Sequence, residues 1–216
     1  MSMTTRPPKT SALGMAWTED FKRGYTGIAK GGGIITGAVP IVGEWSTFDS
    51  TNMITYPSLR ISSAALSVGC WCRKIVADTA IQMLFKQMDD AALSGFYVRT
   101  ADTWATVVGC IIISGTSRTV AAVVPAGSVT SSAPNLFIVT WASGDYIRLY
   151  HNGVQTGISG ATYTGVVTEL PLQCFTLGAW SAGVQGLKGE MKMPHVVNRQ
   201  LSAQEVMDLY AGKSLR

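Results

Sequence analysis

The sequence is poor in charge. Asp, Glu, Lys and Arg make up 14% of the 216 residues, against roughly 25% in an ordinary soluble chain. Apolar residues reach 47%, so the chain can fill a sizeable core but has few ionic side chains to cover it. We expect a surface of Ser, Thr, Gly and backbone groups that is partly covered by other subunits, because low charge weakens the usual defence against self-association.

Other features that the sequence lacks exclude a membrane-spanning helix, a secretory signal and a disulfide framework. The sequence has no run of about 18 apolar residues, so no membrane-spanning helix is expected, and residues 1–20 lack the apolar segment of a secretory signal. The four cysteines are Cys70, Cys72, Cys110 and Cys174. Cys70 and Cys72 lie two apart on one predicted strand, about 7 Å from each other, which disfavours a bridge between them. We expect free buried thiols and synthesis in a reducing cytosol.

The net charge of +4 is concentrated at the start of the chain, where residues 1–33 hold five basic and two acidic residues. This segment has poor periodicity, contains Arg6-Pro7-Pro8-Lys9 and ends in three glycines. We predict an extended basic N-terminal arm over 1–33, followed by one domain over 34–216. Five basic residues without Arg-rich repeats do not predict a nucleic-acid partner.

A period of two dominates the rest of the sequence and predicts short antiparallel strands. The stretch 136–153 shows it best: it alternates on both sides of Ser143-Gly144-Asp145, and Asn152-Gly153 suits a turn that demands positive φ. The predicted strands are 38–44, 52–56, 66–76, 80–87, 95–100, 106–113, 119–124, 135–142, 145–151, 161–167, 172–177 and 187–197. A dozen strands at this spacing predict two packed sheets.

Along the strand that begins at Leu66, alternation predicts which side chains face the core. Leu66, Val68, Cys70 and Cys72 should point inward, and the residues between them should point outward. Only the end of the chain predicts a helix. Ser202 and Glu205 form a capping box, Leu201 can pack on Val206, and Gly212 can end the helix in a left-handed conformation.

Five motifs, in this order, give the chain a family resemblance. They are Phe48-Asp49 with the strand at 53–57, the strand 66–72, the set Trp141, Tyr150, Asn152 and Gly153, the pair Leu177-Gly178, and the segment 189–205. Together they resemble the laminin G-like branch of the concanavalin A-like lectin/glucanase superfamily over residues 38–212. The resemblance implies an all-β, two-sheet antiparallel jelly-roll sandwich with one short C-terminal helix.

The last motif departs from the family pattern. Lys192 stands where the family usually has Asp, Met193 replaces an acidic residue, and Pro194 lies inside the predicted strand. Because proline removes a hydrogen-bond donor, this segment should lie at an edge or a bulge. The loss of the acidic residues leaves no motif for calcium, and no cofactor is expected.

The superfamily includes glucanases, so the resemblance raises the hypothesis of an enzyme. A retaining glycosidase needs two carboxylates about 5.5 Å apart, and no strand carries an E-x-D-x-x-E arrangement. Glu190 has Lys192 in place of a partner, and Glu169 and Glu205 are isolated, on a predicted loop and on the predicted helix. The only histidines, His151 and His195, are expected to be ordinary surface or edge residues. We predict that the chain is not an enzyme.

Aromatic side chains give the only binding signal. Trp71 and Trp141 lie in well-patterned strands and should pack in the core or between the sheets. Trp104, next to Asp102, and Trp180 lie in predicted turns, where an indole can stack on a sugar ring while a carboxylate binds its hydroxyls. The alternative is that these indoles pack on a neighbouring subunit or on their own loop.

These features lead to three hypotheses for function. The first is a non-enzymatic bacteriophage virion component, such as a capsid decoration, fibre or tail-associated protein, which by analogy with other lone domains would be made in the host cytoplasm. Its arm, through Arg6, Lys9, Lys22 and Arg23, would bind other virion proteins or copies of itself, and host-surface glycans are a further partner. The second is a carbohydrate-binding lectin module, and the third is a glycoside hydrolase.

Overall fold

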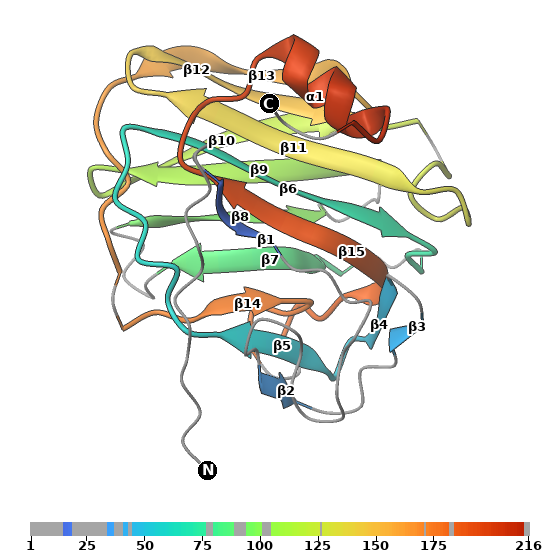
Figure 1. The fold of residues 1–216 in the computed structure, drawn as a ribbon. Helices are drawn as coiled ribbons and strands as arrows, with labels where there is room; N and C mark the ends of the chain where they lie inside the picture. The colour runs from blue at the N-terminus through green and yellow to red at the C-terminus, as the bar shows by residue number, and fades with distance from the viewer. Residues whose placement is uncertain are drawn as a thin grey trace.

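Two antiparallel β-sheets lie face to face with the hydrophobic core between them (Figure 1). This computed structural model describes residues 15–18, 34–36, 41–42, 45–76, 80–88, 94–100, 105–125, 127–170, 172–181 and 184–213. The prediction of an all-β sandwich with one short C-terminal helix is confirmed. Among the described residues, no helix is long and apolar enough to cross a membrane.

The front sheet carries the hairpin that dominates the sequence pattern. Its order is β13-β12-β11-β6-β15-β4-β3, and β1 pairs with β15 beside this path. The strands are β1 (Met15–Thr18), β3 (Ile41–Val42), β4 (Trp45–Asp49), β6 (Ala65–Arg73), β11 (Asn135–Ala142), β12 (Asp145–His151), β13 (Val154–Tyr163) and β15 (Lys188–Val197).

The back sheet has the order β10-β9-β8-β7-β14-β5-β2. Its strands are β2 (Ile34–Thr36), β5 (Met53–Tyr56), β7 (Met83–Met88), β8 (Gly95–Thr100), β9 (Thr106–Ile113), β10 (Thr116–Val123) and β14 (Phe175–Leu177). Since β13 and β10 are the edge strands on the same side of the sandwich, they lie next to each other (Figure 1).

The core follows the predicted alternation. Leu66, Val68, Cys70 and Cys72 are all fully buried between the sheets. Trp141 is fully buried as well, and its indole nitrogen donates to the carbonyl of Tyr163 at 3.1 Å. Burying side chains of this size supplies the main driving force for joining the two sheets.

The hairpin and its second turn form as predicted. Asn152 (φ 50°) and Gly153 (φ 84°) both adopt the left-handed conformation that a type I′ turn needs. Asn152 also accepts a hydrogen bond from the backbone N–H of Leu136 at 2.8 Å, which ties the turn to β11. A side chain at Gly153 would clash with Met207, because α1 (Ala203–Tyr210) packs over this turn.

The helix begins and ends where the sequence predicted. Glu205 N–H donates to the Ser202 hydroxyl, and the Ser202 N–H donates to the Glu205 carboxylate, which completes the capping box. Leu201 and Val206 are buried in a small apolar cluster between α1 and the outer face of the front sheet. Gly212 follows the helix at φ 77°.

Several strand boundaries were wrong. Strand β13 runs over Val154–Tyr163 instead of 161–167, directly after the Asn152-Gly153 turn. Its glycines lower strand propensity, but pairing with β12 outweighs that local preference. Strand β4 was missed, because the predicted strand 38–44 ends just before it; the described part of 38–44 forms the two-residue β3.

Strand β15 contains the irregularity that Pro194 predicted. Its pairing with β6 shifts register between Lys192 and His195, and Met193 there has φ 46°. The proline is thus accommodated at a bulge, as expected from its missing donor.

Residues Met15–Thr18, inside the segment predicted as an arm, form β1 and pair with β15. The rest of residues 1–33, including Arg6, Lys9, Lys22 and Arg23, lies outside the described residues. The arm and its boundary at residue 33 therefore stay predictions.

All four cysteines are free, but they are not all buried as expected. Cys70, Cys72 and Cys110 are buried and Cys174 is exposed, because it lies just before the short strand β14.

Candidate functional site

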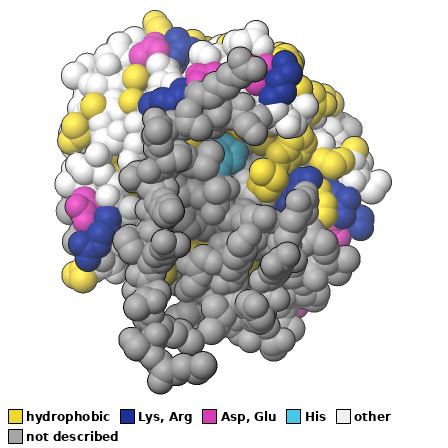
Figure 2. Space-filling view, viewed as in Figure 1, with side chains coloured by type: hydrophobic (Ala, Val, Ile, Leu, Met, Phe, Trp, Pro, Cys, Tyr) yellow, Lys and Arg dark blue, Asp and Glu magenta, His cyan; other side chains and the backbone are white. Residues whose placement is uncertain are grey.

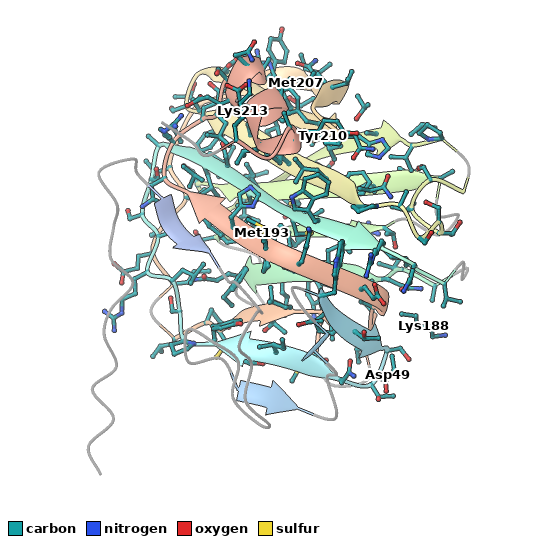
Figure 3. All side chains as sticks on the ribbon, turned by 45° about the vertical axis from the view of Figure 1, so that its right-hand side comes forward. Asp49, Lys188, Met193, Met207, Tyr210 and Lys213 are labelled. Atoms are coloured by element: carbon teal, nitrogen blue, oxygen red, sulfur yellow. The ribbon has the colours of Figure 1, made fainter. Side chains whose placement is uncertain are left out.

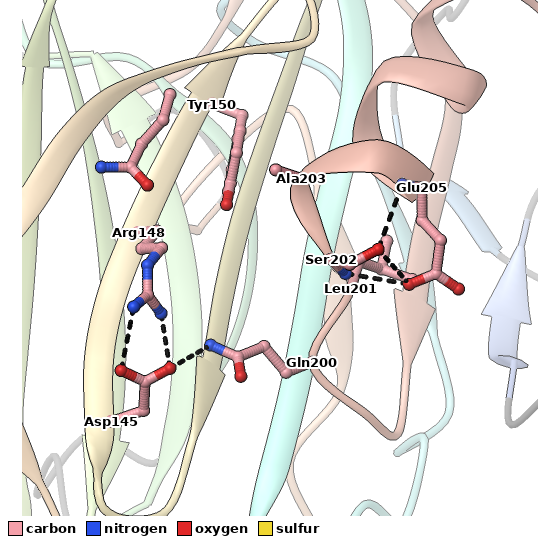
Figure 4. A pocket seen from close by; sticks show the side chains of 9 residues that line it. Asp145, Arg148, Tyr150, Gln200, Leu201, Ser202, Ala203 and Glu205 are labelled. Carbon is pink, nitrogen blue, oxygen red and sulfur yellow. Dashed lines mark hydrogen bonds and ion pairs between the residues drawn. The ribbon is translucent and has the colours of Figure 1, made fainter.

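A polar pocket of about 420 Å³ opens on the outer face of the front sheet, between β12 and the start of α1 (Figure 4). Strand β12 and its neighbour β13 supply one wall, and the residues before and at the start of α1 supply the other. The lining residues are Asp145, Arg148, Tyr150, Gln155, Gln200, Leu201, Ser202, Ala203 and Glu205. Most of them carry a hydrogen-bonding side chain, which distinguishes this pocket from an apolar cavity.

Asp145 is the centre of the first wall. The Arg148 guanidinium donates to both of its oxygens, at 2.6 and 3.0 Å, and the Gln200 amide donates to the same carboxylate at 3.0 Å (Figure 4). The Arg148 hydrogen bonds hold the pKa of Asp145 well below its ordinary value, and they raise the pKa of Arg148. Two-point contacts of this kind fix the plane of both side chains.

The second wall depends on the helix cap. Glu205 accepts from Ser202, as described above, and also from Arg199 at 2.5 Å. The Arg199 hydrogen bond, helped by those from Ser202, lowers the pKa of Glu205 to about 2. The carboxylate is therefore ionised at neutral pH and stabilises the start of α1.

A buried hydroxyl fixes the distance between this wall and the sheet. Ser67 on β6 is fully buried; its hydroxyl donates to the carbonyl of Arg199 at 2.8 Å and accepts from the N–H of Leu201 at 2.9 Å. Leu201 and Tyr150, which line the pocket, also pack in one apolar cluster. Ser67 does not line the pocket, so it holds the second wall in place without contacting a ligand.

The pocket offers planar hydrogen-bonding groups next to a tyrosine. Gln155 and Gln200 each carry an amide that can donate and accept, and Arg148 and Asp145 add charged donors and acceptors. Neighbouring hydroxyl groups on one ring present matching donors and acceptors at short spacing. The arrangement therefore suits a ligand rich in hydroxyl groups.

Two carboxylates line the pocket, although sequence reasoning found no pair. Asp145 and Glu205 are 60 positions apart, and only tertiary structure brings them to one place. A glycosidase needs one carboxyl with a raised pKa to act as general acid. Here the pKa values of both carboxyls are lowered, because each accepts from an arginine.

Trp180, which was predicted to bind glycans, does not line this pocket. Trp180 lies on the outer face of the back sheet, half-buried, with the Lys86 ammonium 4.2 Å from its ring centre and Tyr97 against it edge-to-face. One face of the indole is therefore occupied within the chain. Asp102 and Trp104 lie outside the described residues, so their predicted role stays a prediction.

Trp71 lies outside the core in which it was predicted to pack. It stacks on Tyr210 of α1, with ring centres 5.8 Å apart, and the Lys192 ammonium lies 5.6 Å from its ring and 4.9 Å from that of Trp45. Figure 2 shows hydrophobic side chains gathered beside basic ones on this face. Figure 3 places Met193 and Tyr210 here, both exposed. The indole of Trp71 is therefore already engaged by Tyr210 and Lys192 within the chain.

Neither histidine is the surface residue that was expected. His151 is buried, stacks on Phe137 and contacts the Asn135 amide oxygen at 2.8 Å. His195 is buried on β15; its Nδ1 donates to the Met193 carbonyl at 3.1 Å, and its Nε2 has no partner among the described residues. Burial lowers the pKa of both imidazoles.

The described residues contain no cluster of three or more His, Cys, Asp or Glu side chains that could hold a metal ion.

Two toxin binding domains that are longer than this chain share its fold. The binding domain of botulinum neurotoxin serotype G matches with a TM-score of 0.70 and 12% identity over 91% of this chain and 50% of that one. The binding domain of Paraclostridial Mosquitocidal Protein 1 gives 0.68 and 12%, over 92% of this chain and 52% of that one. The chain thus spans about half the length of these two domains.

A third similar structure is close to this chain in size. Domain 4 of AbnA, a GH43 extracellular arabinanase from Geobacillus stearothermophilus solved in complex with arabinotriose, matches with a TM-score of 0.61 and 16% identity, over 91% of this chain and 98% of that one. At such identities these likenesses concern the fold.

A search among curated proteins found no match. Residues 48–207, however, match the family described as the concanavalin A-like lectin/glucanases superfamily, in its laminin G type. This match covers most of the chain and includes the hairpin, the pocket walls and most of the helix. The chain therefore belongs to the concanavalin A-like lectin/glucanases superfamily.

Proposed function

We propose that this chain is a non-catalytic carbohydrate-binding domain that holds a glycan in the pocket between β12 and α1. The observation that carries the proposal is the pocket itself, in which Arg148, Asp145, Gln155 and Gln200 present hydrogen-bonding groups beside Tyr150. Family membership supports it, and so does the likeness to a domain solved with arabinotriose and to toxin binding domains.

The absence of catalysis is part of the proposal. Hydrolysis needs a carboxyl that is protonated at working pH, and the lowered pKa values of Asp145 and Glu205 leave both ionised. Assays for reducing-end release on the polysaccharides that bind should give no product. Product formation that is lost in Asp145→Asn would instead favour a glycoside hydrolase.

Binding can be tested by calorimetry on the full chain, with arabinotriose and a panel of soluble oligosaccharides as probes. Gln155→Ala and Gln200→Ala each remove one polar group from the pocket, and we expect each to weaken binding about tenfold. Gln204→Ala is the matched control, because this exposed glutamine lies on α1 outside the pocket.

The pocket variants must stay folded for the binding result to be interpretable. Thermal unfolding of each variant should stay close to that of the wild type, since Gln155 is exposed and Gln200 is partly exposed. Binding that survives both pocket variants would contradict the assignment of this pocket. If Trp180→Ala then abolished it, the site would lie on the back sheet.

A place on a virus particle is a separate hypothesis that rests on the sequence alone. The basic residues Arg6, Lys9, Lys22 and Arg23 would provide the attachment, and removing residues 1–14 tests Arg6 and Lys9 without touching β1. Loss of particle association with retained glycan binding would support it. Of the three hypotheses from the sequence, the carbohydrate-binding domain has the better support from the fold neighbours.

A further inference from the structure

The carboxylate of Asp145 is engaged almost completely by groups of the chain itself. A carboxylate has room for about four hydrogen bonds. Asp145 accepts two from the Arg148 guanidinium, one from the Gln200 amide and one from the backbone N–H of Tyr146 at 2.7 Å. The contacts with Arg148 and Gln200 can be followed in Figure 4. Most of the acceptor capacity of Asp145 is therefore used within the chain.

The second carboxylate of the pocket is engaged in the same way. Glu205 accepts from the Arg199 guanidinium, and from the backbone N–H and the hydroxyl of Ser202 at 2.9 and 3.0 Å. Arg199 offsets part of this negative charge, but it does not line the pocket, whereas Glu205 does. The lining thus contains two carboxylates and one guanidinium, which is an excess of one negative charge.

The one guanidinium of the lining already has an anionic partner. Arg148 directs both terminal nitrogens at the Asp145 carboxylate, and one of them also donates to the Tyr146 carbonyl at 3.4 Å. Taking a carboxylate out of water costs free energy unless a cation pairs with it. A ligand carboxylate would therefore find no unpaired cation among the described residues of the lining.

The uncharged groups of the pocket, in contrast, are open to a ligand. Gln155 on β13 lies directly opposite Tyr150 on β12, so the two side chains share the outer face of the front sheet. The Gln155 side chain is exposed and has no hydrogen-bond partner among the described residues. Gln200 donates to Asp145 through its amide nitrogen, which leaves its carbonyl oxygen available.

We propose that the pocket selects uncharged glycans and excludes those that carry a carboxylate, such as uronic and sialic acids. This inference rests on the proposed function and names the class of its ligand. The amides of Gln155 and Gln200 suit hydroxyl groups, which both donate and accept. Asp145 and Arg148 act as positioning residues, because their ion pair fixes the Gln200 amide and leaves no cation for an acidic sugar.

Calorimetry on the full chain tests this selection with three forms of one probe. The first is a neutral oligosaccharide from the panel above, the second is the same oligosaccharide with a primary hydroxyl oxidised to a carboxylate, and the third is the amide of that acid. The amide keeps nearly the shape of the acid without its charge. We expect the acid to bind at least about tenfold more weakly than the neutral form, and the amide to bind nearly as well as the neutral form.

Asp145→Asn should shift the preference toward the acid. The substitution removes the anionic partner of Arg148 and leaves a guanidinium that can bind a ligand carboxylate. The acid should therefore bind the variant about tenfold more tightly than it binds the wild type. Asp208→Asn is the matched control, because it removes the same charge from α1, where Asp208 pairs with Lys213 outside the pocket. It should leave the affinities for all three forms unchanged.

The possible outcomes separate charge selection from glycan binding. Equal binding of the acid and the neutral form to the wild type, with both weakened by Gln155→Ala, would overturn the selection and leave the proposed function standing. This comparison needs no variant at Asp145, so it holds even if Asp145→Asn unfolds. Failure of all three forms to bind would overturn the proposed function, and the ligand class with it. A folded Asp145→Asn that still excludes the acid as the wild type does would refute the role given to the ion pair.

Discussion

Replacing Glu205 by Gln tests how the helix cap stabilises the pocket wall. Gln keeps an acceptor for the Ser202 N–H but loses the charge that faces Arg199. The ion pair is partly exposed, with side-chain exposures of 32% and 28%, so it is worth ~0.2–1 kcal/mol. A carboxylate in the first helical turn adds ~0.3–1 kcal/mol. We therefore expect a loss of about 1 kcal/mol in the free energy of unfolding near neutral pH, or about 2–4 °C in Tm.

The lowered pKa of Glu205 determines how this difference in unfolding free energy changes with pH. The pKa of Glu205 is lowered to about 2 in the folded chain, whereas an unfolded Glu titrates near pH ~4.3. Its contribution is complete above the unfolded pKa and is lost as pH falls through the folded pKa. The difference between wild type and Glu205→Gln should therefore shrink between about pH 5 and about pH 2.

Urea denaturation of both proteins at about pH 7, 5 and 3 measures this difference. Glu169→Gln is the control, because its ion pair with Arg60 is long, at 3.6 Å, and well exposed. It should change stability by less than ~0.5 kcal/mol. A difference for Glu205→Gln that stays constant to the lowest pH would refute the role given to its charge.

Three other predictions concern single positions. Gly178→Ala should destabilise the fold by about 2 kcal/mol or more, because φ is 81° and a Cβ would lie 2.2 Å from the ring of Phe48; equal denaturation midpoints for variant and wild type would contradict this. Ser67→Ala should cost about 1–3 kcal/mol in unfolding free energy, since the buried N–H of Leu201 and the partly buried carbonyl of Arg199 lose their partner. Ellman's reagent should modify Cys174 rapidly in the native chain and the other three cysteines only after unfolding; fast reaction of more than one thiol would show that the burial is wrong.

Local chemistry in the sequence determined the elements that need no distant partner. Asn152 and Gly153 tolerate positive φ whatever surrounds them, and Ser202 and Glu205 cap a helix with their own backbone, so the turn and the helix start were predictable. Alternation determined the inward face of β6 for the same reason: successive side chains must point to opposite sides of a strand. These regularities were enough to identify a two-sheet sandwich.

Tertiary structure alone decided the strand at 154–163 and the composition of the pocket. Strand β13 contains glycines that argue against a strand locally, yet β12 and the close approach of β10 favour it. The pocket joins Asp145 to Gln200 across 55 positions, and Ser67 holds the second wall through bonds to residues more than 130 positions away. Sequence spacing carries no record of such contacts, because they depend on how the sheets and the helix finally pack.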